Sequence, residues 1–124
     1  MCACAFCEIV AGTRPAEVLY RDDLFIAFLD IRPRSPGHTL VIPKKHERWV
    51  WDVEPQAEYW LLARRIARAQ KRAFAAEAVW CNVLGDEVPH AHIWIYPHPA
   101  TKGSRLDLPG NARILKQALD EIPG

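Results

Sequence analysis

One long helical pattern, at residues 55–76, divides the chain and constrains its fold more than any other feature. Apolar residues recur there at steps of three and four, and Pro55 suits the first turn of a helix. The opposite face is strongly basic, which is typical of a solvated helix surface. The apolar positions are Tyr59, Leu62, Ala63, Ile66, Ala69 and Ala73. We therefore expect an amphipathic helix with one face against a core.

Short apolar and β-branched runs flank this helix and predict five strands. Residues 18–20 and 25–29 surround a charged turn, and residues 38–42 follow a segment rich in Pro and Gly. Residues 79–84 and 90–96 form two further runs, and apolar residues at helical spacing near the end predict a short C-terminal helix. This order predicts an α+β fold, with a largely antiparallel five-stranded sheet, one long central helix and a short C-terminal helix.

The composition is that of an ordinary folded protein and argues against several classes. At 124 residues the chain fits one domain, 1–124, because single cores commonly span about 100 to 150 residues. Sixteen Lys and Arg against fifteen Asp and Glu leave a net charge of +1, which draws the protein neither to nucleic acid nor to a membrane. No run approaches the roughly 18 apolar residues that span a bilayer, and the first six residues lack the basic start of a signal peptide. We expect a cytoplasmic protein.

The cysteines are concentrated at the N-terminus. Three of the four lie within residues 2–7, too close together to staple a fold with disulfides. Metal binding or reduced thiols explain them better, while Cys2 and Cys81 have no motif partner.

The most informative segment is PHAHIWIY, at residues 89–96. Because side chains alternate along a strand, His90, His92 and Trp94 are expected on one face and the residues between them in the core. Two histidines at this spacing suit metal chelation or nucleophilic catalysis, and plain packing is the third alternative. The segment by itself leaves these three explanations equally open.

Four blocks of sequence resemble the histidine-triad (HIT) family of nucleotide-binding proteins. They are CAFCEIVAG at residues 4–12, AFLDI at 27–31, PGHTLVIPKKH at 36–46 and VPHAH at 88–92. Their order and approximate spacing match the family, and the resemblance extends from about residue 4 to residue 97.

The resemblance implies a nucleotide-phosphate enzyme that acts through His92. In the family, the middle histidine of His-x-His-x-His attacks the α-phosphorus of a nucleotide, and water or another acceptor resolves the nucleotidyl-histidine. His92 stands at that position, with His90 beside it as a further catalytic residue and His38 as the upstream histidine that supports the reacting group. Imidazole suits this chemistry because it is nucleophilic near pH 7.

The resemblance also implies a purine nucleotide or dinucleotide substrate, with no organic cofactor. Asp30 matches the acid that binds ribose hydroxyls, and Asn82 matches an asparagine that contacts phosphate, although a strand-end polar residue without a ligand is its alternative. The walls around the base would be Phe6, Ile9, Phe28, Ile31 and Leu40, which plain core packing explains equally well. A homodimer is expected through the long helix and a neighbouring strand, and the aromatic residues compatible with that contact are Trp49, Trp51, Tyr59 and Trp60.

A bacterial subset of the family holds zinc, and this chain has the corresponding residues. Cys4 and Cys7, together with His46 and His90, resemble that site, since two thiolates and two imidazoles satisfy tetrahedral Zn²⁺. A pair of reduced thiols packed at the N-terminus is the alternative.

Trp94 stands where the motif has its third histidine. Indole offers one N–H donor and no proton that titrates near neutrality, so this position cannot protonate a departing group. A branch of the family that transfers nucleotides from sugar phosphates has glutamine there, so attack itself does not require the third histidine. We therefore expect phosphoanhydride or nucleotidyl-sugar substrates rather than phosphoramidates. The alternative is a catalytically impaired nucleotide-binding or interaction module of the same fold.

Three further residues near the motif have no assigned role. Asp86 and Glu87 lie where the family has small neutral residues, and they would repel an anionic substrate unless they point away. His98 lies six extended residues beyond His92, about 20 Å at about 3.3 Å per residue, which is too far to share one phosphate.

Overall fold

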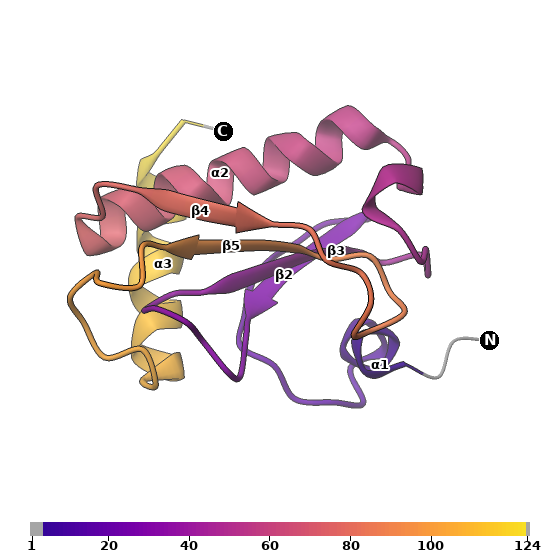
Figure 1. Ribbon diagram of the computed structural model, residues 1–124, viewed down its shortest axis with the longest axis horizontal. Helices are drawn as coiled ribbons and strands as arrows, with labels where there is room; N and C mark the ends of the chain where they lie inside the picture. The colour runs from indigo at the N-terminus through magenta and orange to yellow at the C-terminus, as the bar shows by residue number, and fades with distance from the viewer. Residues whose placement is uncertain (1–3, 124) are drawn as a thin grey trace.

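The computed structural model describes residues 4–123, which form one five-stranded sheet and three α-helices (Figure 1). All neighbouring strands are antiparallel, in the order β1-β2-β3-β5-β4. The elements are α1 (Ala5–Ala11), β1 (Val18–Arg21), β2 (Phe25–Leu29), β3 (Thr39–Pro43), the 3-10 helix η1 (Val50–Asp52), α2 (Gln56–Phe74), β4 (Val79–Asn82), β5 (Ile93–Pro97) and α3 (Leu108–Glu121). The predicted α+β fold is confirmed.

The central strands β2, β3 and β5 are buried on both faces. Alternate residues of each strand enter two separate apolar clusters. One cluster lies between the sheet and the helices α2 and α3, and includes Phe25, Val41 and Ile93. The other lies on the opposite face, where Phe6 and Ile9 of α1 contact the sheet. Figure 1 shows α1 set apart from the other two helices, as this two-sided packing requires.

Helix α2 matches the predicted amphipathic helix. Five of the six predicted apolar positions are buried and Ala73 is half-buried, while Arg64, Arg68 and Arg72 are exposed on the outer side. The amide of Gln70, also on the buried side, donates to the carbonyls of Gly37 and Ile95, at 2.9 and 2.8 Å. These bonds fix the start of β3 against the end of β5, beside His38. No helix within residues 4–123 is long and apolar enough to cross a membrane.

The loop before β3 depends on a glycine. Gly37 has φ = 81°, in the left-handed region that side chains disfavour, and a Cβ there would collide with Phe74. The turn at Gly37 leads directly into His38, which is buried.

Two local expectations differ from the structure. The sequence did not predict the short helix α1, which begins at Ala5 and is capped by Cys4, whose sulfur accepts a bond from the Cys7 amide at 3.3 Å. The strand expected at residues 90–96 begins only at Ile93, because the amide of Ala91 instead donates to Glu47 in the loop after β3. Cys2 lies outside the described residues.

Candidate functional site

His92 lies just before β5, at the wall of an apolar cavity of about 330 Å³. Its Nδ1 is 2.7 Å from the carbonyl oxygen of His90. A carbonyl only accepts, so Nδ1 carries the proton and Nε2 keeps a lone pair. The ring packs edge-on against Phe6, with 5.1 Å between centroids. His92 therefore has the tautomer and support that a nucleophile at Nε2 requires.

The cavity brings together most of the residues that the sequence assigned to nucleotide binding. Phe6 and Ile9 come from α1, and Phe28 and Leu40 come from neighbouring positions of β2 and β3. Ile31 is 71% exposed and forms part of the rim. The predicted residues that line this cavity are Phe6, Ile9, Phe28, Asp30, Ile31, Leu40, His92 and Trp94.

His38 lies beside this cavity with its tautomer also fixed. The backbone N–H of Arg34 donates to Nδ1 at 3.1 Å, so the proton of neutral His38 is on Nε2. Nε2 lies 3.7 Å from a carboxylate oxygen of Asp30, too far for a hydrogen bond. Burial is the largest effect on His38 and lowers its pKa to about 4; Asp30 opposes this and Arg34 adds to it. His38 is therefore a neutral donor at neutral pH.

Trp94 is 7% exposed and lies between the two histidines. Its ring centroid is 5.3 Å from that of His38 and 6.5 Å from that of His92. The Arg34 guanidinium lies over the indole, 4.9 Å from its centroid.

Two predicted site residues, Asn82 and His90, serve other contacts, and His98, which had no assigned role, lies outside the cavity lining. Asn82 donates to the hydroxyl of Tyr96 at 3.1 Å, on the strand next to Trp94. His90 turns away from the cavity, as described below. His98 is exposed and packs edge-on against Trp80.

Two charged residues line the cavity that the sequence did not assign to it. Arg14 follows α1 and pairs with Glu8 at 3.1 Å, and Glu87 lies in the loop before His90. Arg14 lies outside any motif, so nothing in the sequence singled it out. The exposed side chain of Glu87 reaches the cavity wall, where its negative charge would repel an anionic substrate.

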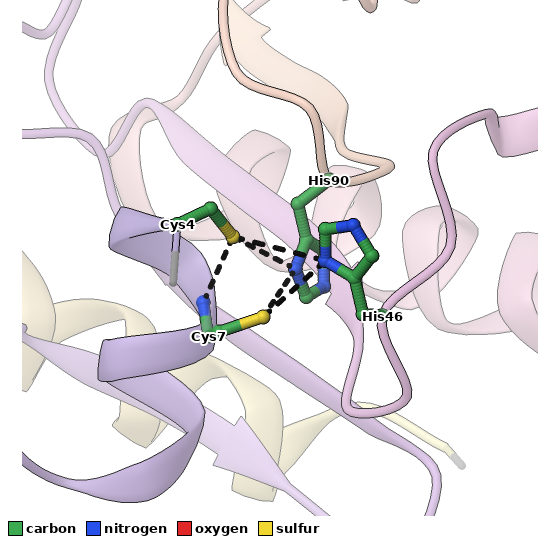
Figure 2. Close-up of side chains that lie close together, drawn as sticks. All are labelled: Cys4, Cys7, His46 and His90. Atoms are coloured by element: carbon green, nitrogen blue, oxygen red, sulfur yellow. Dashed lines mark hydrogen bonds between the residues drawn. The ribbon is translucent and has the colours of Figure 1, made fainter. Parts of the chain in front are cut away.

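A second cluster joins the N-terminus to the histidine segment (Figure 2). Cys4 and Cys7 of the first helical turn point toward His46, from the loop after β3, and His90. The Cys4 sulfur lies 3.9 Å from Nδ1 of His46 and 3.4 Å from Nδ1 of His90. The Cys7 sulfur lies 3.3 Å and 3.4 Å from the same two atoms. All four donor atoms lie within 4.8 Å of one another.

This geometry fits a tetrahedral zinc ion. Donors at about 2.0 to 2.3 Å from one ion lie about 3.3 to 3.8 Å apart, close to the distances observed. The Nε2 of His90 lies 2.8 Å from the carbonyl oxygen of Pro43, which places the proton on Nε2 and leaves the Nδ1 lone pair toward the sulfurs. Burial, as the main cause, lowers the pKa of His90 and favours the neutral form that a metal needs.

A family model described as the HIT domain matches residues 11–100, which include most of the cavity lining and the two histidines of the metal cluster. The chain belongs to the HIT family. An uncharacterised HIT-like protein of Methanocaldococcus jannaschii is 37% identical over 130 residues, covering 98% of this chain and 99% of the relative.

Other HIT relatives have a described ligand or activity. The crystal structure of a zinc-bound histidine triad family protein from Mycobacterium smegmatis has a TM-score of 0.83 and 32% identity, covering 96% of this chain and 94% of that one. An adenylylsulfatase of Arabidopsis thaliana is 32% identical over 103 residues, covering 76% of this HIT chain but 51% of the relative. The family thus includes enzymes that act on nucleotides.

Proposed function

We propose that this protein is a nucleotidyl hydrolase or transferase that acts on the α-phosphorus of a nucleotide through a covalent intermediate on His92. The observation that carries this proposal is the bond from His92 Nδ1 to the His90 carbonyl, which leaves the Nε2 lone pair for attack beside a cavity of nucleotide size. A purine would lie between the apolar walls, with its ribose near Asp30.

Neither step of this mechanism requires an acid at position 94. The Nε2 lone pair forms a bond to phosphorus, the bond from phosphorus to the departing oxygen breaks, and its electron pair leaves with that oxygen as an anion. Water then bonds to phosphorus, the phosphorus–nitrogen bond breaks with its electron pair returning to Nε2, and the water proton is released to solvent. The His38 Nε2–H can donate to a phosphoryl oxygen, because burial keeps the ring neutral.

Because position 94 cannot supply a proton, the departing group determines which substrates react well. Phosphate, pyrophosphate and sulfate depart as anions, whereas an amine must be protonated as it departs. The Arabidopsis adenylylsulfatase supports this direction, since the bond it breaks releases sulfate. We expect higher kcat/KM for a dinucleoside polyphosphate or adenylyl sulfate than for an adenosine phosphoramidate, and the reverse order would contradict the preference.

Trapping of the covalent intermediate tests the proposed function directly. Incubation with a nucleotide labelled at the α-phosphate, followed by rapid quenching in alkali, should leave an acid-labile label on the wild-type protein. His92→Asn should abolish the label and reduce turnover by at least about 1,000-fold, because the nucleophile is removed. The matched control is His98→Asn, since His98 is exposed and packs on Trp80. Nucleotide binding without label or turnover would instead support the binding module.

We also propose that Cys4, Cys7, His46 and His90 hold a structural Zn²⁺. The ion would supply a fixed tetrahedral centre and no chemistry on the substrate. Its effect on the site is indirect, because α1 also carries Phe6, which packs against His92.

A further inference from the structure

The indole of Trp94 is a buried donor whose Nε1 has no acceptor among the described residues. Native proteins pair nearly all buried donors, so such an exception needs a physical explanation. The ring lines the same cavity as His92, and a ligand oxygen entering that cavity is an acceptor that the chain itself does not provide. The Nε2 of His38 is a second buried donor without an acceptor among the described residues. The centroids of the His38 and Trp94 rings lie 5.3 Å apart.

Arg34 adds a positive charge to this indole. Its guanidinium lies within cation–π distance of the ring, and it forms no ion pair with any carboxylate in residues 4–123. Arg14, which lines the cavity, differs because Glu8 neutralises it at 3.1 Å, whereas Arg34 lies at the cavity only through its contact with Trp94. The charge of Arg34 is therefore available for an anion.

The position of Arg34 is built into the loop between β2 and β3. Its backbone N–H donates to His38 at 3.1 Å, while the amide of Arg32 donates to Asp30 at 2.9 Å. The same loop conformation that fixes the tautomer of His38 thus places the Arg34 side chain over Trp94. The charge of Arg34 also acts on His38, since it is one of the causes that lower the pKa of that ring.

We propose that Arg34 and Trp94 together form the subsite for the departing group, and that this subsite selects nucleotides in which the α-phosphorus carries a second tetrahedral oxyanion. The proposal rests on the proposed function and names the part of the substrate that these two residues recognise. The guanidinium and the indole offer only N–H donors, which suit phosphate or sulfate oxygens and cannot protonate an amine. Arg34 pairs with the non-bridging oxygens of that oxyanion, which departs with the electron pair of the broken phosphorus–oxygen bond and needs no proton.

The test compares two substrates that both release an anion, only one of which is a tetrahedral oxyanion. Adenosine 5′-phosphosulfate releases sulfate, whereas the 4-nitrophenyl ester of AMP releases 4-nitrophenolate, which has no sulfuryl or phosphoryl oxygens for Arg34 to bind. Arg34→Gln should lower kcat/KM for the phosphosulfate about 10- to 100-fold, the range of a charge-assisted hydrogen bond, and for the aryl ester by less than about 3-fold. Arg34→Lys should recover part of the loss. Arg32→Gln, which removes a charge from the same loop, should leave the ratio of the two kcat/KM values unchanged.

A binding measurement separates failure of this subsite from failure of the proposed function. In a His92→Asn background, calorimetry should show tighter binding of ADP than of AMP, and Arg34→Gln should remove the difference. Equal losses for both substrates, or an ADP preference that survives Arg34→Gln, would overturn the subsite while leaving the nucleophile in place. Absence of label and turnover with either substrate would contradict the proposed function, and the ADP and AMP affinities would then decide the subsite independently.

Discussion

At the scale of single residues, backbone contacts determine the chemistry of three histidines. The Nδ1–H of His92 and the Nε2–H of His90 each donate to a backbone carbonyl oxygen. This leaves Nε2 of His92 for the cavity and Nδ1 of His90 for the cysteines. A backbone N–H holds Nδ1 of His38 and leaves its proton on Nε2. Identical side chains therefore serve as a candidate nucleophile, a candidate metal ligand and a neutral donor because of the partner that each meets.

The buried His38 should make the stability of the protein depend on pH. Its pKa is about 4 in the folded protein and about 6.5 in the unfolded chain, so between these values only the unfolded chain binds the proton. The free energy of unfolding should therefore fall as the pH is lowered from about 6.5 to 4, by at most about 3 kcal/mol from this group. Urea denaturation at several pH values would measure the slope, and His38→Asn should flatten it. An identical slope in both proteins would show that other groups cause it.

At the scale of elements, α1 links the two clusters of side chains. Its first turn carries Cys4 and Cys7, and its buried side carries Phe6 and Ile9, which line the cavity. His46 and His90 come from segments joined by the bond between Ala91 and Glu47. A metal ion held by this cluster would therefore fix α1 against the histidine segment and stabilise the cavity wall.

Loss of one sulfur ligand should test this link. Protein purified under reducing conditions should contain about one Zn²⁺ per chain by elemental analysis, and Cys4→Ser should lose most of it. The midpoint of thermal unfolding should fall by several degrees in Cys4→Ser or after chelation, because metal binding contributes to folding. Cys81→Ser is the matched control, since Cys81 is a free, exposed cysteine on β4. Metal content that is unchanged in Cys4→Ser would rule out this ligand set.

At the scale of the whole molecule, the sheet ends in an open strand. β4 pairs with β5 on one side only, and it presents Trp80, which is 44% exposed. The expected dimer contact through Tyr59 is wrong, because Tyr59 is completely buried, stacks on Phe25 and donates to the Val41 carbonyl. An exposed edge strand with an aromatic side chain is a suitable surface for a second copy of the chain.

We therefore expect the protein to dimerise through the β4 edge. Sedimentation equilibrium should give twice the chain mass for the wild type, and Trp80→Arg should shift the population toward monomer because it places charge in the interface. Ile114→Arg is the control, since Ile114 is 42% exposed on α3, which contacts β1 at the opposite edge of the sheet. A wild-type monomer, or a dimer that is insensitive to Trp80→Arg, would refute this interface.

The sequence by itself determined the fold class and most of the cavity. Short apolar and β-branched runs specified the central strands, and the three- and four-residue spacing specified α2, because both patterns reflect local backbone geometry. The motif blocks identified Asp30, His38 and His92, and the structure brings all three to the cavity region.

Only the tertiary structure decided which nitrogen of each histidine is free, and where the charges lie. His90 and His92 were expected to share a face, but the bond from Ala91 to Glu47 interrupts the strand pattern, and the His90 ring joins the cysteines. The stacking of Arg34 on Trp94 joins residues 60 positions apart, and the short helix α1 has too few turns to show a period. These features depend on contacts between distant segments, which no local pattern of residues encodes.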